Sequence, residues 1–183
     1  DLEQANQWLI YQDDNILAVN KPPGLLTIPD GYNTSLPKVK SLLEPLWGKL
    51  WIVHRLDKET SGALLIARNA KMHRYLNLQF QDRKVEKIYH ALVYGQPDWS
   101  TMECKMPLKV NGDRKHRTIV DLGKGKPAST TFILKDSFFD SSLVEALPHS
   151  GYTHQIRAHL AWLGHPIIAD ELYRGGSFIP RLS

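Results

Sequence analysis

Three side chains in separate segments of the sequence have chemistry that a catalytic site could use: Asp57, Tyr89 and Arg157. A carboxylate beside a guanidinium stays ionised, because the positive charge favours the charged form of the acid. An ionised carboxylate in a fixed place acts as a nucleophile, and a tyrosine stacks on a planar ring and transfers protons. Each residue also has an ordinary structural role open to it, and spacing alone does not bring the three together.

The stretch around Asp57 places charged residues between two apolar runs. Residues 52–68 read IVHRLDKETSGALLIAR. Two strands are predicted here, over 51–53 and 63–67, and the turn between them is rich in Thr, Ser and Gly. Such a turn is either a solvated hairpin tip or a rigid holder for the aspartate.

Two further elements have to position the tyrosine and the arginine. The alternation of residues 87–95 predicts a strand that carries Tyr89 on the face opposite Ile88 and Leu92. The three-to-four spacing of apolar residues over 153–164 predicts a helix that carries Arg157. Thr153 is the predicted N-cap of this helix, and a Gly and a Pro follow its end.

Other elements complete the predicted fold. Strands are expected on both sides of an Asp-Asp-Asn turn and over 129–136 and 142–147, and helices over 70–81, capped by Asn69, and within 34–48, interrupted by Pro45. Several strands for each helix, often adjacent in sequence, predict an α+β fold with a mixed, largely antiparallel sheet.

The composition sets limits on the class of protein. The 183 residues are 42% hydrophobic and carry a net charge of +4, which suits one or two globular units with a core. No apolar run approaches the roughly 20 residues that a membrane span needs. The single cysteine, Cys104, excludes an internal disulfide framework, fits a reducing compartment and is predicted to be a packing residue.

A metal site is not predicted. Four histidines crowd the last third of the chain, but His154 and His159 are five residues apart and do not share one face of a helix. No pair of cysteines adds zinc ligands. Glycoside hydrolysis stays open as an alternative, because Asp57 could work with a second carboxylate about 5–9.5 Å away.

Basic residues concentrate in one glycine-containing stretch, residues 109–126, which reads KVNGDRKHRTIVDLGKGK. Such side chains on a loop are able to follow a phosphate backbone, although a solvated surface loop has the same composition. We predict that Lys115 and Arg117 in this stretch contact nucleic acid.

The residues HRLDKETSGALLIARN resemble the signature of the RluA-like pseudouridine synthases. Three other segments resemble family motifs in the family's order: IYQDDNILAVNKPPGL, KIYHALVYG and THQIRAHLAWLGHPIIADELY. Together they run from about Trp8 to Tyr173, so the resemblance covers most of the chain.

The resemblance implies a pseudouridine synthase catalytic fold with flanking helices and a central RNA-binding cleft. It implies an isomerase that converts uridine in ribosomal or transfer RNA to pseudouridine without a metal or another cofactor. Asp57 would be the catalytic aspartate, Tyr89 would stack on the target base, and Arg157 would pair with Asp57.

The resemblance also implies a set of RNA contacts. Arg55 would insert into the RNA stack near the flipped nucleotide, in keeping with the need to take a base out of its stack. The other expected contacts are His54, Thr60, Lys87, His154 and Gln155. The expected partner is an RNA stem-loop, with no membrane and no obligate protein partner, for a cytoplasmic monomer.

The chain departs from the family pattern at a few points. Tyr152 stands where the family often has a basic residue, and Ala169 stands where glycine often precedes the aspartate of the next motif. One catalytic domain is expected over 8–183, without an N-terminal S4-type RNA-binding domain and without the family's closing segment. A non-catalytic RNA-binding relative of the same fold remains the first alternative.

Overall fold

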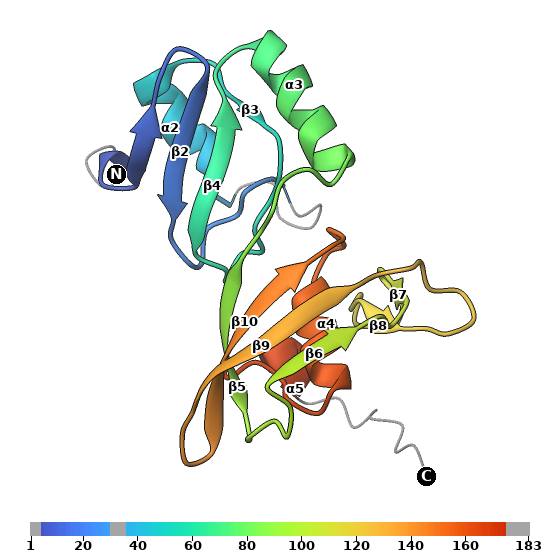
Figure 1. Cartoon of the computed structure of the whole chain (residues 1–183). Helices are drawn as coiled ribbons and strands as arrows, with labels where there is room; N and C mark the ends of the chain where they lie inside the picture. The colour runs from blue at the N-terminus through green and yellow to red at the C-terminus, as the bar shows by residue number, and fades with distance from the viewer. Residues whose placement is uncertain (1–4, 30–35, 175–183) are drawn as a thin grey trace. The chain divides into compact units, whose positions relative to one another are not determined.

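Residues 5–29 and 36–174 are described by the computed structural model of the chain. The chain divides into two units, Asp1–Val85 (unit 1) and Glu86–Ser183 (unit 2). Every named strand pairs antiparallel with its neighbours, and helices accompany both four-stranded sheets, so the predicted α+β class is confirmed (Figure 1). The expectation about a closing segment after residue 174 lies outside the described residues.

The sheet of unit 1 has the strand order β1-β2-β4-β3. Its strands are β1 (Leu9–Gln12), β2 (Ile16–Lys21), β3 (Trp51–Ile52) and β4 (Gly62–Ala67). On the buried face of β2 and β4, Leu17 pairs with Ile66 and Val19 with Leu64. Because side chains alternate along a strand, the next residue on this apolar face of β2 is Lys21.

Two helices belong to unit 1: α2 (Val39–Trp47) and α3 (Ala70–Gln81). The predicted bounds of α3 are confirmed, and the Asn69 side chain caps it by accepting a hydrogen bond from the Met72 N–H at 2.8 Å. Helix α2 continues through Pro45 to Trp47, so the predicted interruption was wrong. Proline removes only one hydrogen bond here, close to the end of the helix.

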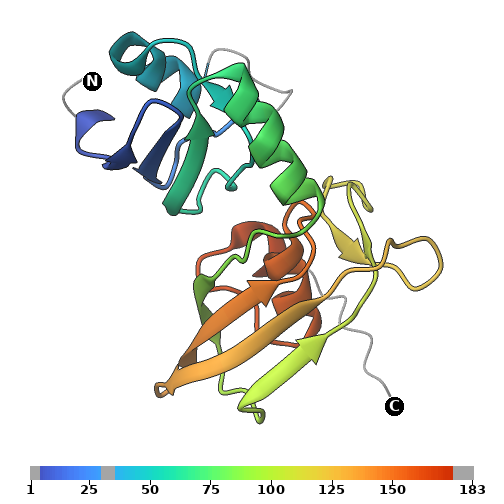
Figure 2. The same ribbon diagram turned by 45° about the horizontal axis from the view of Figure 1, so that its top comes forward.

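The sheet of unit 2 has the order β5-β10-β9-β6. Its strands are β5 (Tyr89–Tyr94), β6 (Thr101–Cys104), β9 (Thr130–Ser137) and β10 (Ser141–Pro148), and it is accompanied by α4 (Gln155–Trp162) and the short α5 (Glu171–Arg174). Both views show α4 against one face of this sheet (Figure 1, Figure 2).

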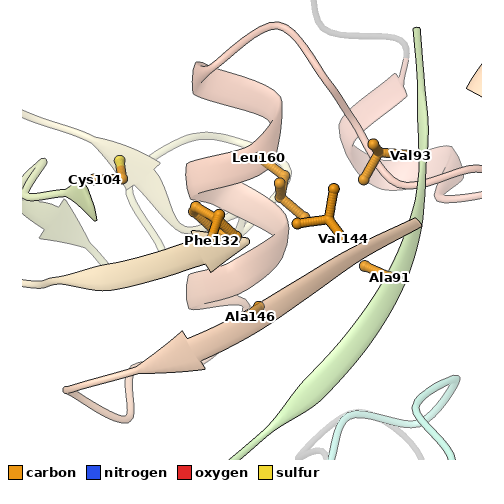
Figure 3. Close-up of a cluster of buried hydrophobic side chains, with 7 residues drawn as sticks. All are labelled: Ala91, Val93, Cys104, Phe132, Val144, Ala146 and Leu160. Carbon is orange, nitrogen blue, oxygen red and sulfur yellow. The ribbon is translucent and has the colours of Figure 1, made fainter. Parts of the chain in front are cut away.

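A cluster of buried apolar side chains joins α4 to that sheet (Figure 3). Its members are Ala91, Val93, Cys104, Phe132, Val144, Ala146 and Leu160. Leu160 is the contribution of the helix, which confirms the predicted apolar stripe. Cys104 is only 3% exposed, so its predicted role as a packing residue is confirmed.

His159, on α4, is the polar member of the same helix face and is fully buried. Its Nε2 lies 2.9 Å from the Met106 carbonyl oxygen, and its Nδ1 lies 2.9 Å from the Thr130 hydroxyl. Burial lowers the pKa of His159, so the ring is neutral. Its Nδ1 contact ties the helix to strand β9, and its Nε2 contact ties the helix to the segment after β6. In residues 5–29 and 36–174, no three His, Cys, Asp or Glu side chains are grouped as metal ligands.

The basic stretch forms a folded loop around the ladder of β7 (Leu108–Lys109) and β8 (Ile119–Val120). At two positions of this loop glycine is required, because neighbouring atoms lie too close to leave room for a Cβ atom. A Cβ atom at Gly112 would overlap the Ile119 side chain, and one at Gly125 would overlap the backbone of Asp121. None of the described helices is long and apolar enough to cross a membrane.

Helix α4 begins differently from the prediction. Its N-cap is His154, which has left-handed backbone angles (φ 57°, ψ 20°), and no side chain caps the helix. The Gln155 N–H bonds the Tyr152 carbonyl at 3.1 Å, and the Thr153 carbonyl accepts a hydrogen bond from the Thr118 hydroxyl. The prediction that Thr153 caps the helix was wrong, because a long-range contact determines the turn.

The backbone angles at Ala169 show why the family pattern often has glycine at this position. Its φ is +63°, in the left-handed region, where a side chain costs roughly 1–2 kcal/mol and glycine is relaxed. This turn directs the chain into Asp170 and α5.

We expect Ala169→Gly to stabilise the protein by about 0.5–1 kcal/mol, since relief of the strained backbone exceeds the entropy that glycine adds to the unfolded chain. The thermal unfolding midpoint should rise by about 1–3 °C. The control is Ala161→Gly inside α4, which should lower stability by roughly 1 kcal/mol. A midpoint that falls for both variants would contradict the prediction.

Candidate functional site

The segment that leads to Asp57 has no regular secondary structure, yet ring contacts fix its start. The His54 Nε2 accepts a hydrogen bond from the Leu65 N–H of β4 at 2.9 Å. The same ring stacks on Phe80 of α3, with centroids 4.6 Å apart and planes 17° from parallel. The Nε2 atom of His54 therefore carries no proton, and the ring is part of the packing of unit 1. The neighbouring Arg55 is exposed.

Leu56, directly before Asp57, is held at both of its peptide groups by one side chain. The Thr27 hydroxyl donates to the Leu56 carbonyl at 2.9 Å and accepts from the Leu56 N–H at 3.2 Å. Both residues are buried. Because neither bond is exposed to competing water, this pair fixes the backbone on the N-terminal side of Asp57.

Lys58, directly after Asp57, is held by a buried ammonium group. The Nζ of Lys21 donates to the carbonyl oxygens of Lys58 at 3.0 Å, Pro22 at 2.8 Å and Leu25 at 2.8 Å. An ammonium has three donors, and all three are used, while the side chain is fully buried. The Lys58 carbonyl also accepts from the Gly24 N–H at 2.9 Å.

The charge of Lys21 is coupled to the carboxylates of the turn. Burial lowers its pKa, and the charges of Glu59 and Asp57 act in the opposite direction. The turn itself closes with a hydrogen bond from the Thr60 N–H to the Asp57 carbonyl at 3.1 Å. Thr60 thus supports the turn through its backbone, and Asp57 is half-buried between two fixed neighbours.

Sequence reasoning missed Lys21 and Thr27. A signal for the lysine was present, because the alternation of Leu17, Val19 and Lys21 places a charged residue on an apolar face. A charge at such a position needs several hydrogen-bond partners, which predicts a polar anchor. Thr27 carries no comparable signal.

Tyr89 is the first residue of β5 and pairs with Ala146 of β10. It is half-buried and packs against the core cluster of unit 2 on the same face as Ala91 and Val93, as predicted. Nearby in sequence, the Nζ of Lys87 donates to the Ser150 carbonyl at 3.3 Å. The ring of Tyr89 is therefore seated on the sheet rather than carried by a loop.

Arg157 projects from α4 and forms a two-point ion pair. Its Nε donates to Oδ2 of Asp170 at 2.7 Å, and its Nη2 donates to Oδ1 at 2.9 Å. The guanidinium carbon lies 5.0 Å from the ring centroid of Tyr173. Forked geometry of this kind fixes both the place and the plane of a guanidinium.

Tyr173 is a second residue that sequence reasoning missed. Its hydroxyl donates to the Thr118 carbonyl and accepts from the Thr118 N–H, both at 3.0 Å. The His154 ring meets it edge-on, with Nδ1 3.3 Å from the hydroxyl. The structure thus brings two of the predicted residues, His154 and Arg157, to one buried tyrosine.

Gln155 is buried, and its amide is fully engaged inside unit 2. The carbonyl oxygen accepts from the Ser150 hydroxyl at 2.8 Å and the Tyr152 N–H at 3.2 Å. The amide nitrogen donates to the Ser129 carbonyl at 2.9 Å and the Thr130 hydroxyl at 3.0 Å. These bonds use both donors and both lone pairs, which gives Gln155 a structural role at the start of α4.

The two basic residues predicted in the loop have different surroundings. The Arg117 Nε donates to Asp113 at 2.7 Å, its Nη1 donates to the Leu172 carbonyl at 3.2 Å, and its side chain is 17% exposed. Burial acts to raise the pKa of Asp113, but hydrogen bonds from Arg117 outweigh it and the pKa is lowered. Lys115 is exposed, so it is the better placed of the two to meet a ligand.

Each unit therefore presents groups with chemistry of its own. Unit 1 offers a half-buried carboxylate, Asp57, on a segment fixed from both sides. Unit 2 offers a phenol ring at Tyr89 and an oriented guanidinium at Arg157. A fixed carboxylate is suited to nucleophilic or acid–base work, and the ring and the cation are suited to holding a planar base and its developing charge.

Two bacterial relatives align with most of this chain. A dual-specificity RNA pseudouridine synthase RluA of Vibrio parahaemolyticus is 36% identical over 170 residues, which are 90% of this chain and 68% of that protein. The ribosomal large subunit pseudouridine synthase C of Vibrio cholerae is 39% identical over 171 residues, 90% of this chain and 52% of that protein. The chain thus spans about half the length of the second relative.

A solved structure supports the same relationship. The human RNA pseudouridylate synthase domain containing 4 superposes with a TM-score of 0.78 at 27% identity, over 94% of this chain and 70% of that one. The family model described as RNA pseudouridylate synthase matches residues 15–162, a range that includes Asp57, Tyr89 and Arg157. The resemblance inferred from the four motifs is confirmed, and the chain belongs to the RNA pseudouridylate synthase family.

Proposed function

We propose that this chain catalyses the isomerisation of uridine to pseudouridine in RNA, with Asp57 as the catalytic residue. The observation that carries the proposal is the double anchoring of Asp57, by Thr27 at Leu56 and by Lys21 at Lys58. It occurs inside the segment that the family model matches. A carboxylate that must meet a reacting atom benefits from a backbone that does not move.

The reaction is an internal exchange of bonds. The N1–C1′ glycosidic bond breaks, the uracil rotates, and a C5–C1′ bond forms; the C5 proton leaves and N1 gains one. Atoms and electrons balance within the substrate and water, so no cofactor enters the scheme. The carboxylate of Asp57 is suited to attack on C6, to attack on C1′ and to assistance in glycal formation.

Unit 2 contributes the remaining roles in the proposal. Tyr89 stacks on the target uracil and assists removal of the C5 proton, and its seat on the sheet supports a fixed ring. Arg157 is the third proposed site residue, and its oriented guanidinium is suited to stabilising negative charge that develops during the reaction. The exposed Arg55 enters the RNA stack in place of the extruded nucleotide.

The proposed substrate class is ribosomal or transfer RNA, as the names of the relatives suggest. Unpaired or splayed bases in a stem-loop are the usual targets of sequence-specific RNA recognition. Lys87, Lys115 and His154 are the proposed contacts outside the catalytic group. The proposal also includes a monomer in the cytoplasm, a setting compatible with a single buried cysteine.

The first prediction concerns catalysis. Asp57→Asn and Asp57→Ala should abolish tritium release from RNA labelled at C5 of uridine, a loss of roughly 10⁴-fold or more, because the carboxylate is the reacting group. The RNA affinity of Asp57→Asn should stay within about threefold of the wild-type affinity, since the side-chain shape is kept. Unmodified total ribosomal and transfer RNA are the substrates, and the exposed Asp98→Asn is the control.

Either of two results would count against this assignment. Release by Asp57→Asn at the wild-type rate would remove Asp57 from the chemistry. Tight RNA binding by the wild-type protein with no release from any RNA would favour the RNA-binding relative that lacks catalysis.

The second prediction concerns the anchor of the turn. Lys21→Met keeps the apolar stem but leaves the carbonyls of Pro22, Leu25 and Lys58 without their donor, which should cost roughly 2–4 kcal/mol of stability. Chemical denaturation and single-turnover release measure stability and rate. The matched control is Lys40→Met on α2, whose exposed pair with Glu44 contributes about 0.5 kcal/mol or less. Equal stability of both variants would show that the buried ammonium is not an anchor.

The third prediction concerns the basic loop. Lys115→Ala should weaken RNA binding and reduce the slope of log affinity against log salt concentration by about one unit, because one phosphate contact is lost. Arg117 is left unchanged in this test, since its ion pair with Asp113 holds the loop. Lys105→Ala, an exposed lysine of the same unit, is the control. An unchanged slope for Lys115→Ala would place that residue outside the RNA footprint.

A further inference from the structure

One edge of the Arg157 guanidinium is held by Asp170. The two hydrogen bonds, 2.7 Å and 2.9 Å long, engage Nε and Nη2 together. The side chains are 22% exposed for Arg157 and 7% for Asp170, so water competes little for the bonds. A guanidinium bound through this edge has its plane and its opposite edge fixed in direction.

The face of the same guanidinium lies on the ring of Tyr173. The separation of 5.0 Å is within the range of a cation–π contact. The ring cannot swing away, because its hydroxyl is bound to both peptide groups of Thr118. A second cation, Arg117, approaches the same ring at 5.9 Å and donates a hydrogen bond to the carbonyl of the preceding residue, Leu172.

The sequence brings these two groups to Arg157 by one short turn. Asp170 and Tyr173 are three residues apart at the start of α5, and the Tyr173 N–H bonds the Asp170 carbonyl at 3.3 Å. Residues with this spacing lie on one side of a helical turn. The left-handed Ala169 sets the direction in which the turn begins, at a cost in backbone energy.

We propose that Asp170 and Tyr173 are positioning residues that hold Arg157 in the orientation that the reaction needs. The inference rests on the proposed function, in which Arg157 is the cationic site residue of unit 2. Asp170 neutralises much of the charge of Arg157, so what the pair supplies to the site is direction more than positive charge. A displacement of about 1 Å in such a group is enough to slow a reaction 100-fold.

The competing explanation is an ion pair that only joins α4 to α5. The two explanations differ in what a variant loses. Loss of a positioning residue slows the chemical step in protein that is still folded and still binds RNA. Loss of a structural ion pair lowers the unfolding midpoint and leaves the rate of the folded protein unchanged.

The test uses single-turnover tritium release with enzyme in excess, RNA affinity by filter binding, and thermal unfolding. Rates are measured at least about 15 °C below the midpoint of the least stable variant, so that the protein stays folded. Asp170→Asn should slow tritium release by roughly 10–100-fold, while its RNA affinity should stay within about threefold of the wild-type affinity. Asp170→Glu should recover part of the rate, and Glu171→Gln, an exposed neighbour on α5, is the matched control.

Tyr173 is tested by a pair of variants. Tyr173→Phe keeps the ring under the guanidinium and loses only the hydroxyl, so the rate should fall by about threefold or less. Tyr173→Leu removes the ring face and should slow release by roughly tenfold or more. Equal rates for the two variants would remove the ring from the proposal.

A double variant separates action through Arg157 from independent effects. If Asp170 acts only through the arginine, Arg157→Lys with Asp170→Asn should be no more than about threefold slower than Arg157→Lys alone. Multiplied losses would overturn the proposal, and so would wild-type rates for Asp170→Asn. If Asp170→Asn does not fold, the release rates of Asp170→Glu and Tyr173→Leu test the same proposal. Absence of release by the wild-type protein would instead refute the proposed function, and the inference with it.

Discussion

The buried ammonium of Lys21 is the interaction on which the candidate site depends. It lies at the end of an apolar row on β2, where the alternation of the strand directs it inward, and it must find partners there or lose its charge. Its three carbonyl partners are Pro22 and Leu25, in the loop that follows β2, and Lys58. The hydrogen-bonding need of one lysine therefore ties two loops together, and the second of them carries Asp57.

The two units hold their functional groups by different means. Unit 1 fixes the backbone on both sides of Asp57 and leaves the carboxylate itself half-buried. Unit 2 fixes a side chain, because the contacts around Tyr173 act on the guanidinium of Arg157 directly. A backbone anchor determines where a residue is, whereas a side-chain anchor also determines which way its charge points. In the proposed reaction, a carboxylate that meets one atom needs the first, and a cation that stabilises developing charge needs both.

Much of the fold was predictable because its signals are local. Helix α3 follows from three-to-four spacing and the Asn69 cap, and the faces of β5 follow from period-two alternation. The start of α4 was not predictable, since a hydrogen bond from Thr118, 35 residues earlier, shapes the turn. The anchors were missed for the same reason: Lys21 and Lys58 are 37 residues apart, and Tyr173 and Thr118 are 55 apart. Motif resemblance identified the family, but it gave Gln155 an RNA contact where the structure has a fully bonded internal amide.

The partners of Lys21 are all main-chain oxygens, and Thr27 likewise forms hydrogen bonds with the main chain of Leu56. Any amino acid offers the same carbonyl, so the identity of the residues at positions 25 and 58 is not part of the anchor. A substitution at the exposed Lys58 can therefore leave the placement of the aspartate unchanged, whereas Leu25 is constrained by its own burial. The anchor itself needs only the side chains of the lysine and the threonine, at two positions remote in sequence from the residue they serve.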